Sequence, residues 1–342
     1  MKIEYENPKR REGIMIWEID VSFLEKEKIS DFSKAGGKRA VEEELKRRYG
    51  YDGIYFPSSS RKDIFFAWIA QIKEWETQKN VQINVSPDSG RTYNDEENDN
   101  IINVFEFTKD IIGKKQIKVS FSFDAYETGL YDDFSRVDDY DKSSSIYRRY
   151  TKSESRLGQN EDISSLAREL TRGKTNVVTK ANILYSWVLE NIRYNAESSS
   201  GGAIRSFEKR EGDSKEISFI YIVLMRAIGI PARTVSGVYG EEGRKQSYHS
   251  WTEFYLEGVG WIPVDCVKKM FGKIDNERLI LSKGENILLP RLTDFGNYID
   301  TFGIVYKRAL CLRPDAIFID SNRYGYFIVK KNNYLLIKES RN

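Results

Sequence analysis

The chain has only one histidine, His249, and only two cysteines, Cys266 and Cys311, among its 342 residues. A zinc site built from two or more histidines is therefore excluded, and any reaction that needs an imidazole has a single candidate. A disulfide framework is excluded as well, because two cysteines can form only one bridge. This cysteine content is compatible with a reducing compartment but does not establish one.

Long apolar runs and an excess of one charge are also missing. No stretch approaches the roughly 18 continuous apolar residues of a membrane span, and the N-terminal MKIEYENPKRREG lacks the apolar core of a signal peptide. Lys and Arg number 54 against 52 Asp and Glu, and this near balance argues against a nucleic-acid binder. We expect a cytoplasmic chain as given, with a secreted or periplasmic location open if a signal was removed. The oligomeric state is left open.

Short runs of alternating apolar and polar residues fill the first part of the chain. The clearest are GIMIWEIDVSF, NVQINVS and IKVSFSFDAYE, and this period of two is typical of half-buried antiparallel strands. One helix is expected among them, over residues 38–50, where apolar residues recur at helical spacing. We therefore predict an N-terminal β-rich, sandwich-like domain over residues 1–150.

Helical spacing replaces this alternation after about residue 160. It predicts helices in EDISSLARELTRG and TNVVTKANILYSWVLENIRY, then a loop in NAESSSGGAIRSFEKREGD. The next helix begins in GDSKEISF, where Asp213 or Ser214 can cap it. Three strands follow, in ARTVSGVYG, SYHSWTEFYLEG and GWIPVDCV. The pattern predicts an α+β domain over residues 151–290 and a β-rich C-terminal extension over 291–342 that packs on the others.

Ser214, His249 and Asp265 are the residues on which chemistry would depend. The first turn of a helix offers free backbone N–H groups and the positive end of the helix dipole, a setting that activates a cysteine nucleophile. If the second and third strands are antiparallel neighbours, Asp265 can orient one nitrogen of His249 and leave the other directed at residue 214. The arrangement predicts a nucleophile, a base and an orienting carboxylate.

The segment from about 160 to 290 resembles the transglutaminase-like superfamily, the papain-related fold of transglutaminases, peptide N-glycanases and many microbial proteases. The resemblance rests on five motifs in order: LYSWVLENIRY, REGDSKE, LMRAIGIPARTVSGV, YHSWTEFYLEGVGWIPVD and FGKIDNERLILSKGENILL. It implies a papain-like core in which the helix that carries the nucleophile packs on an antiparallel sheet.

The family's catalytic positions can be placed on this chain one by one. Its histidine falls on His249 and its aspartate on Asp265, whereas its nucleophilic cysteine falls on Ser214, where the match breaks. Trp251 matches the family's His-x-Trp pattern and is expected to be a packing residue. Together with Gly212 and Asp213, which precede the nucleophile position, it is expected to line the substrate cleft.

The resemblance also implies a reaction. A nucleophile at position 214 would attack an amide of a peptide or protein, with His249 as base and then acid, Asp265 as orienter, and the backbone N–H at 214 in an oxyanion hole. For a chain of this shape we favour hydrolysis over cross-linking. No metal or organic cofactor is implied, although the acidic loops leave Ca²⁺ open.

Three interpretations of Ser214 remain. The serine replaces a catalytic cysteine and leaves an inactive form of an enzyme, or it belongs to a natural family member that only binds peptides or glycans. In the third interpretation the serine is itself the nucleophile. We rank this one last, because a helix dipole worth up to ~2 kcal/mol can populate a thiolate but not an alkoxide.

Overall fold

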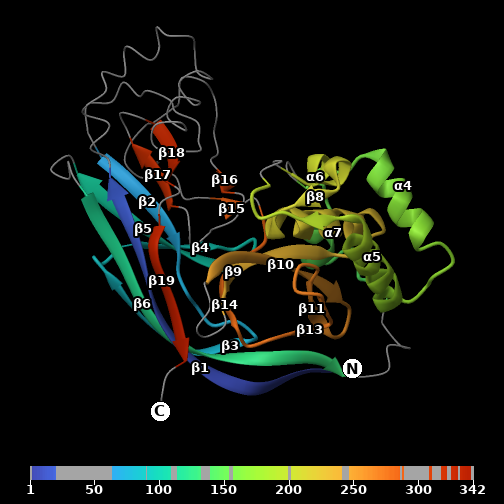
Figure 1. The fold of residues 1–342 in the computed structure, drawn as a ribbon, viewed down its shortest axis with the longest axis horizontal. Coiled ribbons are helices and arrows are strands. Elements are labelled where there is room, and N and C mark those ends of the chain that lie inside the picture. Colours follow the sequence, from blue (N-terminus) through green and yellow to red (C-terminus); the bar gives the residue numbers. More distant parts are fainter. Residues whose placement is uncertain are drawn as a thin grey trace, which may run out of the picture.

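The computed structural model combines antiparallel sheets with a cluster of helices, which confirms the predicted α+β class (Figure 1). The ranges that the structure describes are 2–20, 64–89, 91–108, 114–131, 139–153, 157–198, 202–240, 246–285, 287–288, 308–309, 317–321, 325–329 and 332–339. The helix expected over residues 38–50 and the second cysteine, Cys311, lie outside these ranges.

The first sheet is built on two long strands from the N-terminal part, β1 and β6, which pair antiparallel along most of their length. Its members are β1 (Lys2–Asp20), β3 (Gln78–Ser86), β6 (Lys114–Tyr131), β13 (Lys273–Ile274) and β19 (Asn332–Glu339). Alternate residues of β6, from Ile117 to Ala125, are buried. The period of two predicted there from the sequence is therefore confirmed.

The second sheet carries most of the residues singled out in the sequence. Its strands, in spatial order, are β12 (Met270–Phe271), β11 (Gly260–Asp265), β10 (Ser247–Leu256), β9 (Ala232–Tyr239) and β14 (Arg278–Lys283). The three strands expected after the nucleophile helix are β9, β10 and β11, and they are antiparallel neighbours as required. In Figure 1 the long strands β1 and β6 run beneath this sheet.

A third sheet joins distant parts of the chain. Its strands, in spatial order, are β18 (Gly325–Val329), β17 (Ile317–Ser321), β2 (Ile64–Ala70), β5 (Asn100–Thr108) and β4 (Arg91–Asp95). Two short pairs complete the strands of the described residues: β15 (Ile287–Leu288) with β16 (Arg308–Ala309), and the parallel pair β7 (Arg193–Tyr194) with β8 (Glu211–Gly212). The three-domain division remains a prediction.

The helices gather on the side of the second sheet away from the N-terminal strands (Figure 1). They are α3 (Ser145–Tyr150), α4 (Glu161–Leu170), α5 (Val177–Asn191), α6 (Ala203–Lys209) and α7 (Ser214–Ala227). Helix α6 lies inside the stretch that we expected to be a loop, so that expectation is wrong there. Asn160 and Asn176 cap α4 and α5 with their side chains, so both helices begin where a capping residue precedes the apolar stripe.

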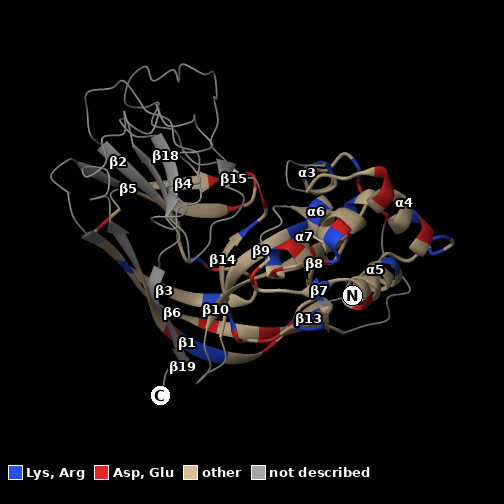
Figure 2. Ribbon diagram, turned by 45° about the horizontal axis from the view of Figure 1, so that its top comes forward, with Lys and Arg blue, Asp and Glu red and all other residues tan. Residues whose placement is uncertain are grey.

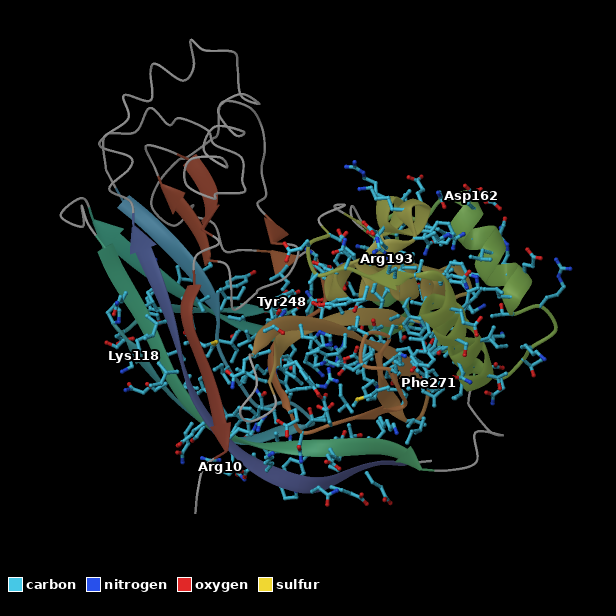
Figure 3. All side chains as sticks on the ribbon, viewed as in Figure 1. Arg10, Lys118, Asp162, Arg193, Tyr248 and Phe271 are labelled. Atoms are coloured by element: carbon cyan, nitrogen blue, oxygen red, sulfur yellow. The ribbon has the colours of Figure 1, made fainter. Side chains whose placement is uncertain are left out.

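Helix α7 is the centre of the main core. It packs against β9 and β10 on one side and against α4, α5 and α6 on the others, so nearly all of its residues are buried. The sequence predicted only a stripe, but ISFIYIVLM is apolar all round, which is the mark of a buried helix. Each fully buried Ile, Leu or Phe side chain contributes about 1.5–3 kcal/mol, so this packing holds the N-terminus of α7 in place. Figure 3 shows the side chains crowded between β10 and the helices.

Charges of both signs alternate over the outer helices, as the near balance in composition leads us to expect (Figure 2). No helix among the described residues is both long and apolar enough to cross a bilayer.

Candidate active site

The N-terminus of α7 is held by a reciprocal cap. The Asp213 carboxylate accepts a hydrogen bond from the Glu216 N–H at 2.8 Å, and the Glu216 carboxylate accepts one from the Asp213 N–H at 3.1 Å. Of the two capping residues that the sequence allowed, the structure uses Asp213. Ser214 is thereby the first residue of the helix, where backbone N–H groups have no partner within the helix.

The hydroxyl of Ser214 faces β10. Its Oγ accepts a hydrogen bond from the backbone N–H of Ser250 at 3.2 Å, and the side chain is only 5% exposed. Ser250 directly follows His249 along the strand, so the contact places position 214 beside the backbone next to the predicted histidine. The hydroxyl groups of Ser236 and Tyr248 lie within hydrogen-bond distance of Ser250 Oγ and hold this part of the strand.

His249 and Asp265 meet across β10 and β11. The register places Thr252 opposite Val264, so His249 and Asp265 lie on the same face, one diagonal step apart. His249 Nε2 is 2.7 Å from Asp265 Oδ2, and the two residues are only 4% and 1% exposed. Because Nε2 is engaged by the carboxylate, Nδ1 is the nitrogen left for a reacting group.

Asp265 is surrounded by hydrogen-bond donors. Its Oδ1 accepts from the backbone N–H groups of Val267 and Lys268 at 3.0 and 2.9 Å, and its Oδ2 accepts from His249 and from Arg278 Nη1, both at 2.7 Å. Burial alone would raise the pKa of Asp265, but the charges of His249 and Arg278 and these hydrogen bonds outweigh it and hold the pKa well below its usual range. Asp265 is therefore a permanent carboxylate at neutral pH.

Gly212, one of the expected cleft residues, lies on β8 directly before the cap. A Cβ added there would lie 2.7 Å from the Cβ of Glu216, so a larger residue would displace the side chain that completes the cap. The neighbouring strand β7 pairs Tyr194 with Gly212. Tyr194 is 52% exposed and its pKa is raised by partial burial and by the charges of Asp213 and Asp265.

Trp251, the remaining expected cleft residue, is a packing residue. It is 1% exposed and belongs to a small core with Trp75, Val235, Ile274 and Ile280. Its ring stacks on that of His249 with the centroids 6.1 Å apart. Trp251 therefore packs against one face of the imidazole.

Arg278, on β14, belongs to the site but was missed in the sequence. It lies at the start of a strand in DNERLILS, where a charged residue is ordinary, and only the tertiary fold brings it to Asp265. No periodicity or spacing could have found it.

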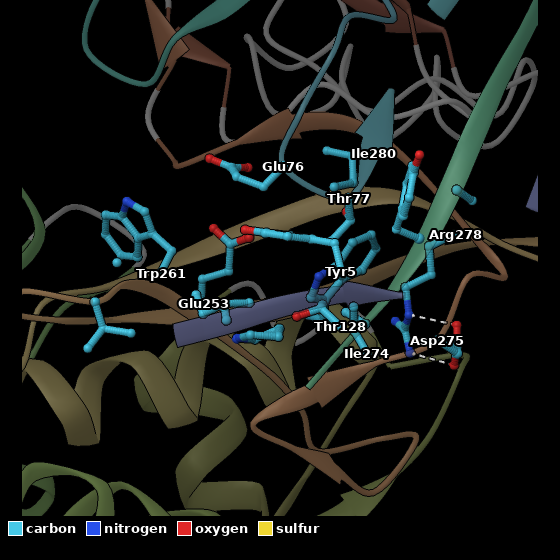
Figure 4. Close-up of a pocket in the computed structure, with 17 residues that line it drawn as sticks. Tyr5, Glu76, Thr77, Thr128, Glu253, Trp261, Ile274, Asp275, Arg278 and Ile280 are labelled. Atoms are coloured by element: carbon cyan, nitrogen blue, oxygen red, sulfur yellow. Dashed lines mark hydrogen bonds and ion pairs between the residues drawn. The ribbon is translucent and has the colours of Figure 1, made fainter. Parts of the chain in front are cut away.

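A cavity of about 160 Å³ lies between the first and second sheets, and two neighbours of the His249–Asp265 pair line it. Trp251 and Arg278 are part of its wall, and Tyr5 and Thr128 line it from β1 and β6 (Figure 4). Two of its carboxylates, Glu76 and Glu253, are bridged by Lys283 Nζ, at 2.8 and 2.9 Å.

No metal site is apparent in the described part of the chain, where no three His, Cys, Asp or Glu side chains gather as potential ligands.

Comparison with known proteins identifies the core around these residues. Residues 164–266 match the sequence profile of the Transglutaminase-like superfamily. The chain is 26% identical over 180 residues to an uncharacterized protein of Haemophilus influenzae, a match that covers 45% of this chain and 48% of the relative. It is 28% identical over 129 residues to the uncharacterized protein YebA of Bacillus subtilis, covering 32% of this chain and 18% of YebA. Each match thus spans less than half of the relative's length.

A similar fold is known from a crystal structure. A candidate cysteine protease from Cytophaga hutchinsonii superposes with a TM-score of 0.58 at 14% identity, over 99% of this chain and 93% of that one. The similarity extends beyond the 164–266 segment and shows a shared fold. The chain contains a transglutaminase-like superfamily domain, and α7, β10 and β11 contribute to it the helix and the two strands that carry Ser214, His249 and Asp265.

Proposed function

We propose that this domain is an acyl-transfer site for amide bonds of peptides or proteins, with Ser214 at the nucleophile position. The observation that carries the proposal is the joint placement of three side chains. Ser214 Oγ lies 3.2 Å from the backbone N–H next to His249, and His249 Nε2 is engaged by Asp265 at 2.7 Å. A base held by a carboxylate, with its second nitrogen free and a nucleophile position nearby, is the arrangement that acyl transfer requires.

With cysteine at position 214, each residue has a defined step. The thiolate attacks the carbonyl carbon, and the oxyanion is held by backbone N–H groups of the first turn of α7. His249 donates the proton taken from the thiol to the leaving amine, so that an acyl-enzyme remains. His249 then removes a proton from water as the water attacks the thioester. The C–S bond breaks, the carboxylic acid is released, and the proton returns from His249 to the sulfur, which restores the thiol. Asp265 keeps the imidazole oriented and stabilises its charged form.

With serine at position 214, this chemistry is strongly impaired. A thiolate–imidazolium pair exists before the attack, whereas a serine must lose its proton during the attack. The Ser214 hydroxyl accepts a hydrogen bond from Ser250, and this single contact does not create an alkoxide. The present chain should therefore bind an amide substrate in the cleft and turn it over slowly or not at all.

Hydrolysis is favoured over cross-linking. The fold neighbour from Cytophaga hutchinsonii, similar over nearly the whole length, is a candidate cysteine protease. Hydrolysis also uses water as the acceptor of the acyl group, so no second protein has to dock at the site, as cross-linking would require.

The test is to make Ser214→Cys and to treat it with a thiol-reactive peptide analogue. We expect covalent labelling at position 214 that is much faster than that of a free thiol. The His249→Ala form of the same variant is the matched control and should lose the acceleration. Cys266 gives little background, because burial raises the pKa of its thiol well above its usual value. Labelling no faster than that of free cysteine would defeat the proposal.

The second candidate function is a non-catalytic family member that binds a peptide or glycan in the same cleft. One observation favours it: within the described residues Ser214 Oγ is bonded to a backbone N–H and not to His249. In that case Ser214→Cys would bind the peptide as the parent does but would not be labelled at an enhanced rate.

A further inference from the structure

Arg278 reaches the predicted site from the far edge of the second sheet. It begins β14, at one end of the strand order, whereas Asp265 lies on β11, and β9 and β10 lie between them. Its guanidinium carbon is 5.0 Å from the ring centroid of Tyr239 on β9 and 4.9 Å from that of Trp251 on β10. The guanidinium therefore crosses the face of the two intervening strands, between aromatic rings, before it meets Asp265.

Arg278 and His249 contact the same carboxylate oxygen of Asp265. Arg278 Nη1 and His249 Nε2 both lie 2.7 Å from Asp265 Oδ2, and the second carboxylate oxygen is occupied by two backbone N–H groups. With every oxygen engaged, the carboxylate cannot rotate. The imidazole is then held with Nε2 toward Asp265 and Nδ1 away from it, which is the orientation that the proposed reaction uses.

Arg278 is itself anchored by a second carboxylate. Its Nε and Nη2 lie 3.2 and 3.3 Å from the two oxygens of Asp275 (Figure 4), and its side chain is 4% exposed. A guanidinium stays charged at all accessible pH values and its planar fork fits carboxylates on two sides.

The charge of Arg278 acts on the imidazole as well as on Asp265. The Asp265 carboxylate favours the protonated imidazole, and a fixed positive charge on the same oxygen opposes it. The other titratable groups that neighbour this cluster are Tyr185, Tyr194, Tyr239, Cys266, Lys268 and Asp275. Of these, Lys268 is held over the Tyr239 ring and Asp275 is paired with Arg278, so Arg278 is the cation in direct contact with Asp265.

We propose that Arg278 is a positioning residue of this site. It fixes Asp265 as the partner of His249, and it places a permanent positive charge on the carboxylate oxygen that the imidazole shares, which offsets part of the carboxylate's charge. The role rests on the proposed function of the His249–Asp265 pair, which is a base that must accept and release a proton.

The single histidine makes the test direct, because an NMR titration of the imidazole carbon-bound protons reports on His249 alone. In the full chain with Ser214 unchanged, Arg278→Met should raise the proton-binding constant of His249 about ten-fold, since one full opposing charge is removed from the shared oxygen. Arg278→Lys keeps the charge and should leave the constant near the parent value. Arg233→Met is the matched control: it removes a buried arginine of the same sheet that pairs with Glu253, and should leave the titration unchanged.

Either of two results would overturn the proposal: an unchanged or lower binding constant in Arg278→Met, or an increase in Arg278→Lys as large as that in Arg278→Met. Folding is checked by circular dichroism. If Arg278→Met does not fold, Arg278→Gln, whose amide can still donate to Asp265, gives the same comparison of charge. Because the titration needs no catalysis, failure of the labelling experiment on Ser214→Cys would leave this result standing, and the two ideas can fail separately.

Discussion

Replacing Asp265 by asparagine should destabilise the protein, because buried groups that now pair with the carboxylate would lose their partner. The carboxylate has four donors around it: two backbone N–H groups, the His249 ring and the Arg278 guanidinium. An asparagine has only one carbonyl oxygen. If that oxygen accepts the two backbone N–H groups, the NH₂ group of the asparagine faces the donors of His249 and Arg278, and these donors lose their acceptor. Removing one partner of a buried ion pair costs about 3–5 kcal/mol. Arg278 keeps Asp275, which places the expected loss at the lower end, about 3 kcal/mol.

The pH dependence of this loss follows from the sign of the pKa shift. The folded pKa of Asp265 lies below its usual value, so its contribution is complete above the unfolded pKa of about 3.9 and declines as pH falls through the folded pKa. The difference between the parent chain and Asp265→Asn should therefore shrink only below about pH 4, where the carboxylate of the parent chain begins to lose its advantage.

Equilibrium unfolding in denaturant, followed by circular dichroism over a pH series, measures both effects. Asp141→Asn is the control, because Asp141 is an exposed carboxylate whose hydrogen bonds, among the residues that the structure describes, come from nearby Ser143. Its replacement should not change stability measurably. A loss below about 1 kcal/mol for Asp265→Asn, the value of a surface pair, would refute this account, as would a difference that does not shrink in acid.

Two further predictions concern groups around the site. The pKa of Glu76 is lowered to about 2, because the charge and hydrogen bond of Lys283 outweigh the effect of burial. The contribution of Glu76 to the free energy of unfolding is therefore complete above the unfolded pKa of 4.5 and disappears toward pH 2. Glu76→Gln should flatten the pH dependence of stability over this window in the same unfolding series, and an unaltered pH profile would contradict the assignment. Gly237 lies opposite His249, and a Cβ there would stand 2.0 Å from the carbonyl oxygen of Leu279 on β14. Gly237→Ala should lower the free energy of unfolding by about 1–3 kcal/mol and lower the melting temperature. An unchanged melting temperature would show that β9 and β14 can separate without cost.

Much of the geometry of the candidate site could be predicted from the sequence, because its residues lie on local patterns. A capped helix start fixes position 214, and two neighbouring strands with a period of two bring His249 and Asp265 to one face. A single histidine also left no choice of base. The α+β class followed from the change of period near residue 160, and the structure confirms it.

The parts that sequence patterns missed depend on tertiary contacts. Arg278 becomes a partner of Asp265 only when β14 closes the sheet, and nothing in its neighbours along the chain marks it. Helix α6 forms in a Ser- and Gly-rich stretch that composition assigns to a loop, because Ala203 and Phe207 are buried against the main core. The burial of α7 on all sides is different, because the apolar segment ISFIYIVLM does indicate it and a prediction limited to one stripe overlooks it.

The most direct measurement is the acidity of a cysteine placed at position 214. In Ser214→Cys, the difference in thiolate ultraviolet absorbance from the parent chain, followed over pH, isolates the new thiol from Cys266 and Cys311. If the N-terminus of α7 and His249 form a nucleophile site, the thiol should ionise below about pH 7.5, well under the value of about 8.5 for a free cysteine, and His249→Ala should raise it. A thiol at 214 that ionises at about 8.5 or above, with or without His249, would contradict the proposed site.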